Sequence, residues 1–173
     1  MRAIPIFALV SIFTGFNIEA ILGQAKEPAP VFRPALQEIK SQTQIPILLP
    51  SRLPSHIREA DIKLAAGDVR KDGYFIALYW EDIGSNSSYA AGFGGSKRVF
   101  EDLPNTRRVT LAGGVIAMFR PVSCGGSCAP ANLWWEQNGV MYNIQIKLGS
   151  TSNEKDQERI LVETANSCVA VRP

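Results

Sequence analysis

Two cysteines near the middle of the chain are the strongest candidates for chemistry. Cys124 and Cys128 are separated by Gly-Gly-Ser, a flexible spacer that lets two sulfur atoms meet. We therefore predict a structural disulfide, formed in an oxidising compartment. A redox-active pair is the alternative, although thioredoxin-type motifs have two intervening residues and lie at a helix N-terminus. The third cysteine, Cys168, is predicted to be a small buried side chain, and its bridging to either of the other two stays open.

The only histidine, His56, is the base that a cysteine nucleophile would need. It follows Pro54 and Ser55 in a predicted turn, and no Gly-x-Ser-x-Gly nucleophile motif is present. One His and three Cys are also too few for an ordinary zinc or iron–sulfur site. We predict no catalytic residue, metal or cofactor. A small thiol-dependent enzyme or redox protein using Cys124 and Cys128, or His56, is the competing hypothesis.

Two consecutive tryptophans, Trp134 and Trp135, are the candidate binding residues. Neighbouring strand residues point to opposite faces of a sheet, so one indole is expected in the core and the other on the second face. An exposed indole there would stack on a sugar ring or a partner surface. A carbohydrate-binding or cell-wall-binding module is therefore another alternative, with packing inside the protein as the simpler role for both rings.

The composition excludes several classes of protein. The chain has 173 residues, with 18 Lys and Arg against 16 Asp and Glu, and a net charge of +2. This balance gives no electrostatic footprint for nucleic acid. With 46% hydrophobic residues and a mean hydropathy of +0.01, the chain is too apolar for a disordered tail. The length suits one domain.

The N-terminus resembles a secretory signal peptide. Arg2 supplies a positive charge, residues 4–16 are mostly apolar, and Gly23-Gln24-Ala25 fits the small-x-small rule for cleavage. The apolar stretch is short for a spanning helix, and Glu19 would be costly inside a membrane. We predict a signal peptide at residues 1–25 and no stable transmembrane segment after cleavage, with an uncleaved anchor as the alternative.

The mature chain is predicted to hold a Pro-rich leader with a short helix, residues 26–44, and a single α+β domain, residues 45–173. Pro34 suits the first position of the short helix, which is expected over residues 34–41. Residues 45–50 contain two prolines and favour an edge strand or a packed extended segment, because proline cannot donate to a sheet ladder.

Most of the domain carries strand and hairpin patterns. Residues 74–80 form an almost unbroken apolar and aromatic run, typical of a central strand. Asn138-Gly139 lies between an apolar run and an alternating run, and it favours a type I′ turn because both residues tolerate positive φ. Gly113-Gly114 predicts a second two-residue hairpin turn between residues 108–112 and 115–120.

The C-terminal segment is predicted to be a helix. Thr151 and Glu154 match a capping box, with Thr151 as the N-cap. Leu161, Ala165 and Cys168 recur at helical spacing and form one apolar stripe, which implies that the helix packs on a sheet. The expected fold is α+β: an antiparallel, mostly sequential β-sheet with a C-terminal α-helix packed on one face.

The order of these segments resembles the extracytoplasmic sheet domains of some bacterial anti-sigma factors and related secreted or lipid-anchored proteins. The resemblance lies in residues 47–54 leading into strands, the hairpin of residues 135–142 and the closing helix of residues 158–168. The sequence shows no sigma-binding segment, full-length membrane span or lipid-attachment cysteine, so regulation of a sigma factor is not carried over. What the resemblance implies is a non-catalytic extracytoplasmic binding or sensing module.

These observations predict a secreted or periplasmic, bacterial, non-enzymatic domain. Its expected partner is an unknown protein or a cell-envelope component, bound through the face of the sheet. Nucleic acid is not an expected partner, because the charge is balanced.

Overall fold

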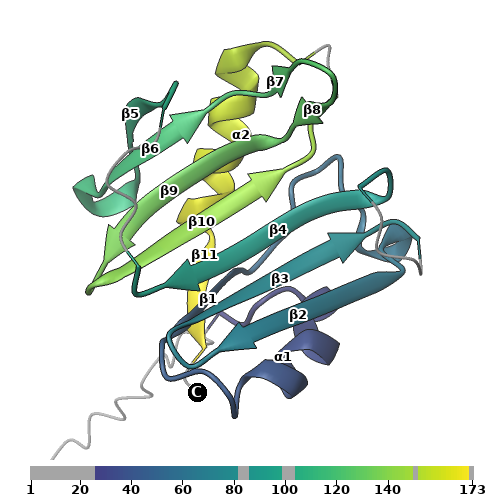
Figure 1. Ribbon diagram of the computed structural model, residues 1–173, viewed down its shortest axis with the longest axis vertical. Helices are drawn as coiled ribbons and strands as arrows, with labels where there is room; N and C mark the ends of the chain where they lie inside the picture. The colour runs from purple at the N-terminus through teal and green to yellow at the C-terminus, as the bar shows by residue number, and fades with distance from the viewer. Residues whose placement is uncertain (1–25, 82–85, 99–103, 150–151, 172–173) are drawn as a thin grey trace, which may run out of the picture.

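The computed structural model describes residues 26–81, 86–98, 104–149 and 152–171, and its main feature is a seven-stranded antiparallel sheet (Figure 1). The strand order is β2-β3-β4-β10-β9-β6-β5, so two runs of strands join where β4 pairs with β10. This main sheet consists of β2 (Leu64–Arg70), β3 (Gly73–Tyr79), β4 (Tyr89–Ser96), β5 (Arg107–Thr110), β6 (Ile116–Arg120), β9 (Ala131–Gln137) and β10 (Val140–Ile146).

The C-terminal helix α2 (Glu154–Asn166) packs on the main sheet over β9 and β10. Its apolar stripe faces the sheet: Leu161 is fully buried and Ala165 is almost so. The predicted antiparallel sheet with a C-terminal helix on it is therefore confirmed. Burying this stripe, rather than intrinsic helix propensity, supplies most of the stability of such a helix.

The start of α2 differs from the prediction. Asn153 is the N-cap, and its Oδ1 accepts a hydrogen bond from the backbone N–H of Asp156 at 2.9 Å. This contact satisfies one of the N–H groups that the first helical turn leaves without a partner. The predicted cap at Thr151 is therefore wrong, and Thr151 itself lies outside the described residues.

A strand that the sequence analysis did not predict follows α2. The helix ends at Asn166, and β11 (Cys168–Val171) pairs antiparallel with β1 (Ile47–Pro50) in a separate two-stranded sheet. Cys168 therefore opens a strand instead of extending the apolar stripe of the helix. Within the extended segment expected over residues 45–50, residues 47–50 form an actual strand, and its partner is the C-terminal strand.

Two tyrosines connect this small sheet to the main sheet. The hydroxyl of Tyr74 accepts a hydrogen bond from the N–H of Leu48 at 2.8 Å and donates one to its carbonyl at 3.0 Å. The hydroxyl of Tyr142 donates to the carbonyl of Pro46 at 3.1 Å. Each buried ring therefore crosses from a strand of the main sheet to the backbone of β1 or the residue just before it.

The N-terminal part of the described chain packs against β2. The helix α1 (Arg33–Ile39) approaches so closely that a Cβ at Gly67 would lie 2.7 Å from Cγ2 of Ile39. The Phe32 ring meets the Phe93 ring edge to face, with centroids 5.1 Å apart. The described residues also form three short 3-10 segments: Pro30–Phe32, Glu59–Asp61 and Ala112–Gly114.

The two predicted hairpins are both present, with different turns. Asn138 and Gly139 have φ values of 54° and 72°, as a type I′ turn between β9 and β10 requires. The β5–β6 hairpin has a longer loop, since the N–H of Leu111 donates to the carbonyl of Val115 at 2.8 Å. The two-residue turn predicted at Gly113-Gly114 is therefore wrong.

Candidate functional site

The main sheet has two different faces. Both helices lie on the face that carries the buried side chains of Ile76, Phe93, Leu133 and Ile144. The other face, which we call the open face, carries no helix among the described residues (Figure 1). Polar side chains of the main-sheet strands therefore reach solvent on the open face and at the sheet edges.

A cavity of about 490 Å³ opens at one end of the open face, where β10 and β4 meet the small β7–β8 hairpin. Its size lies in the range of small-molecule sites, roughly 300–1,000 Å³. We call it the disulfide cavity. Its lining residues come from four segments of the chain: Asn86 and Tyr89; Val122; Ser127, Cys128, Ala129 and Pro130; Gln145, Lys147, Leu148 and Gly149.

Tyr89 and Gln145 form a fixed polar pair in the disulfide cavity. The Tyr89 hydroxyl donates to Oε1 of Gln145 at 3.0 Å. Burial, with a smaller contribution from Tyr79, raises the pKa of Tyr89, so the phenol stays protonated and remains a donor. A Cβ at Gly92 would collide with the Phe75 ring and the Tyr89 hydroxyl, so glycine there makes room for this arrangement.

Lys147 contributes the only charged group among the described lining residues. Its Nζ donates to the carbonyls of Asn86, at 3.3 Å, and Ser87, at 2.6 Å. The ammonium also lies 5.6 Å from the centroid of the Trp80 ring. These contacts hold a positive charge at the edge of the cavity.

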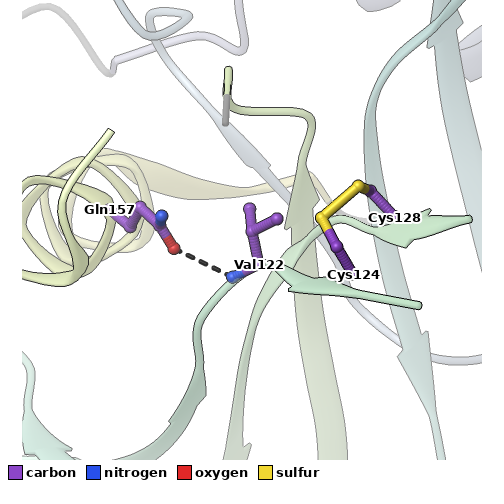
Figure 2. The surroundings of a disulfide bond; sticks show 4 residues. All are labelled: Val122, Cys124, Cys128 and Gln157. Carbon is purple, nitrogen blue, oxygen red and sulfur yellow. Dashed lines mark hydrogen bonds between the residues drawn. A yellow bond between two sulfur atoms is a disulfide. The ribbon is translucent and has the colours of Figure 1, made fainter. Parts of the chain in front are cut away.

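The wall of the cavity contains a disulfide. Cys124 and Cys128 are bonded, as their spacing predicts, and they pair across β7 (Ser123–Cys124) and β8 (Cys128–Ala129). Figure 2 shows how this hairpin is tied to α2: the N–H of Val122 donates to Oε1 of Gln157 at 2.9 Å. The buried Gln157 also donates from Nε2 to the carbonyl of Ser152 at 2.8 Å. One side chain therefore links the base of the hairpin to the start of the helix.

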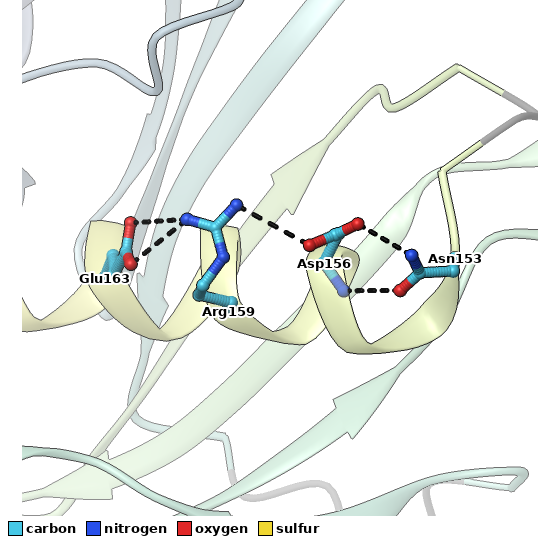
Figure 3. A network of polar contacts seen from close by, with 4 residues as sticks. All are labelled: Asn153, Asp156, Arg159 and Glu163. Atoms are coloured by element: carbon cyan, nitrogen blue, oxygen red, sulfur yellow. Dashed lines mark hydrogen bonds and ion pairs between the residues drawn. The ribbon is translucent and has the colours of Figure 1, made fainter.

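The solvent-facing side of α2 carries a chain of polar contacts (Figure 3). Nδ2 of Asn153 donates to Asp156 at 2.7 Å, and Arg159 lies 3.7 Å from Asp156 and 3.2 Å from Glu163. All four side chains are exposed, so each ion pair contributes at most about 1 kcal/mol. We interpret this network as support for the helix and not as a site.

The two candidate tryptophans lie on opposite faces, as strand alternation predicts. Trp135 is 4% exposed and stacks on Tyr142 on the helix-covered face, with ring centroids 5.7 Å apart. Trp134 lies on the open face, but it is only 7% exposed, and the guanidinium of Arg120 lies 4.9 Å from its ring centroid. Neither ring presents a free face for stacking on a ligand in this conformation.

The residues considered for nucleophilic catalysis are not brought together. Cys168 is a free thiol, and burial raises its pKa to about 12, so it is neutral at physiological pH. Partial burial lowers the pKa of His56, and the backbone of Lys147 partly offsets this shift. No hydrogen bond or common cavity connects His56 to Cys168 among the described residues.

Two buried polar atoms beside the disulfide cavity have no hydrogen-bond partner among the described residues: Nε of Arg120 and Oδ1 of Asn132. These side chains occupy paired positions of β6 and β9, and Asn132 is in turn paired with Gln145 of β10. One atom is a donor and the other an acceptor, and they lie on neighbouring strands. Both side chains lie on the open face, in line with Gln145.

Tyr89, Gln145 and Lys147 were missed as site residues by the sequence analysis. The alternation along β10 indicates that Gln145 and Lys147 share a solvent-facing side, but it does not show which part of that side is hollow. The hollow depends on the approach of the β7–β8 hairpin, and of Tyr89 in β4, to this end of β10. A local pattern carries no information about that approach.

Among the described residues, no group of three or more His, Cys, Asp or Glu side chains could hold a metal ion. Neither helix of the described chain has the length and apolar content needed to cross a membrane. The predicted signal peptide, residues 1–25, lies outside the described residues. Comparisons with models of protein families, with curated proteins and with solved structures found no match.

Proposed function

We propose that this protein is a secreted or periplasmic, non-enzymatic binding domain of bacterial origin, and that its ligand binds in the disulfide cavity. The observation that supports the proposal is the convergence there of apolar walls with the Gln145 amide and the Lys147 ammonium. A few oriented polar groups in an otherwise apolar hollow are typical of ligand sites. The disulfide is consistent with an oxidising compartment.

Native mass spectrometry of the mature protein, purified from the cells that produce it, tests this proposal. We expect wild-type protein to retain a bound small molecule or partner. The variant Ala129→Trp fills the cavity and is expected to lose it, whereas Ala60→Trp, at an exposed position outside the cavity, keeps it. Equal retention by both variants would place the site elsewhere. A wild-type protein without any bound species would contradict the binding function.

Disulfide exchange is a second candidate function, favoured by the exposure of both Cys124 and Cys128. A partner thiolate would attack one sulfur, form a mixed disulfide and release the other cysteine as a thiolate. A second thiol of that partner would then release the reduced protein and leave the partner oxidised. Equilibration with glutathione buffers tests this: a pair that stays oxidised below about −300 mV is structural. A pair that equilibrates near −200 mV supports exchange.

A further inference from the structure

The described lining of the disulfide cavity is electrostatically one-sided. Lys147 is its only charged side chain, and no Asp or Glu is present among the described lining residues. Two of the three N–H groups of Lys147 are used by the carbonyls of Asn86 and Ser87. An ammonium has three donors and no acceptor, so one N–H remains for another acceptor.

The side-chain amide of Gln145, like the Lys147 ammonium, offers a hydrogen-bond donor to the cavity. Its Oε1 is occupied by the hydroxyl of Tyr89, which fixes the orientation of the amide. Its Nε2 donates no hydrogen bond to any described residue. The cavity therefore offers unused donors from two side chains that lie two residues apart on the same side of β10 and its extension.

The rest of the lining is largely apolar. Val122, Ala129, Pro130 and Leu148 contribute hydrocarbon surface, and the disulfide of Cys128 adds to this wall. Apolar surface of this kind binds an aliphatic or aromatic body by removing it from water. A site with donors at one side and apolar walls around them is complementary to an amphiphilic anion.

We propose that the ligand of the disulfide cavity is an organic carboxylate with an apolar body. Its carboxylate pairs with the Lys147 ammonium and accepts a hydrogen bond from Nε2 of Gln145, and its apolar part lies against Val122, Ala129 and Leu148. This inference rests on the proposed binding function and adds the chemical class of the ligand. Hydrogen bonds to a charged group are stronger than neutral ones. We therefore expect the cavity to bind a carboxylate more tightly than a neutral or cationic ligand with the same apolar body.

Three probes with the same chain length test the charge: decanoate, decanol and decyltrimethylammonium, each titrated into the mature protein by calorimetry. We expect decanoate to bind at least about tenfold more tightly than the neutral and cationic probes. Lys147→Met should weaken decanoate about tenfold or more, and Lys147→Arg should restore most of the loss. Lys71→Met, at an exposed lysine in the turn between β2 and β3, is the matched control and should change nothing.

The variant Gln145→Glu keeps an acceptor for the Tyr89 hydroxyl and introduces a negative charge. We expect it to abolish decanoate binding and to improve binding of decyltrimethylammonium. A thermal melt of each variant separates a local effect from unfolding. If a well-folded Gln145→Glu variant binds decanoate as wild type does, the proposed contact is wrong.

The carboxylate could belong to a free organic acid or to the C-terminus of an apolar peptide. Decanoate binding without binding of acetyl-Leu-Leu-Leu indicates a free acid. Binding of that peptide but not of its C-terminal amide indicates a peptide end. Equal affinity for all three ten-carbon probes would overturn the anionic class while leaving a binding function in place. If no probe binds and Ala129→Trp releases nothing from the native protein, both proposals fail.

Discussion

The two ends of α2 meet structures of different kinds. At its start, one buried glutamine connects the helix to an exposed hairpin that a disulfide closes. At its end, the chain turns into β11, which pairs with β1, and the β1 side chains Ile47 and Leu49 are fully buried. We call these the disulfide end and the β11 end.

The two ends of α2 are held in place by different kinds of interaction. The β11 end is held by the apolar burial of β1 and by the hydrogen bonds that Tyr74 and Tyr142 make to the backbone there. The disulfide end is held by single polar contacts and one covalent bond, and the disulfide cavity lies beside it. A covalent cross-link can hold a loop in place without filling the space next to it, so a cavity persists there.

The largest expected effect is a loss of stability at the β11 end. Ile47 is fully buried, so Ile47→Ala should lower the free energy of unfolding by about 2–5 kcal/mol. Val122→Ala, at a half-buried position of the disulfide end, should cost only roughly 1 kcal/mol. Urea unfolding followed by tryptophan fluorescence measures both. Equal losses would remove the distinction between the two ends.

Removing the disulfide should have an intermediate effect. The double variant Cys124→Ser/Cys128→Ser opens a loop with a sequence separation of 4, and loop-closure entropy then predicts a loss of about 2 kcal/mol. Ligand binding should weaken as well, because the cavity wall loses its cross-link. The matched control is Cys168→Ser, which leaves the hairpin intact. Unchanged stability and unchanged binding in the double variant would show that the disulfide end does not depend on its cross-link.

Ionisation of the buried Cys168 thiol is expected to lower the free energy of unfolding only at alkaline pH. Burial raises the pKa of Cys168 to about 12, above the value of about 8.5 for an unfolded thiol. The unfolded chain therefore releases this proton first, so the stability contributed by the neutral thiol is complete below pH 8.5 and is lost as the pH rises toward 12. Burial also raises the pKa of Tyr142, to about 12, and the pKa values of Tyr74 and Tyr89. Ionisation of these phenols therefore also lowers the stability of the folded protein at alkaline pH. Cys168→Ala should flatten the decline of stability between pH 8.5 and 10.

The smallest expected effect lies on the exposed side of α2. Arg159→Ala removes the ion pairs with Asp156 and Glu163, and we expect a change of at most about 0.5 kcal/mol in the free energy of unfolding. The same variant should leave ligand binding unchanged. Thermal unfolding at low and high salt measures the effect. A loss above about 1 kcal/mol would show that this network stabilises the protein more than exposed ion pairs normally do.

Much of the main sheet and of α2 could be predicted from local patterns. The Asn138-Gly139 turn, the apolar run of β3 and the apolar stripe of α2 each carry a signal within a few residues. β11 was missed because Cys168–Val171 is short and directly follows a helix, so the helical spacing of Cys168 concealed the change of structure. The cap at Asn153 was missed because two neighbouring residue types offered competing caps.

At the disulfide end, the sequence predicted the disulfide bond but not the cavity beside it. The spacing of Cys124 and Cys128 indicates that they can pair, but not that Cys128 faces Gln145 and Lys147 across a cavity. Likewise, alternation places Trp134 and Trp135 on opposite faces but does not predict that Arg120 covers Trp134. Both outcomes depend on contacts between different strands, which a pattern within one strand does not specify.

The most direct test of the account is an amide ¹H–¹⁵N spectrum of a protein comprising residues 26–173, titrated with a small-molecule extract of the cells that produce it. We expect shifts to cluster at Tyr89, Ala129, Gln145 and Leu148, around the disulfide cavity. The amides of β1 and β11 should stay in place. Shifts centred on the β11 end, or a spectrum that no component of the extract changes, would contradict the assignment of the disulfide cavity as the ligand site.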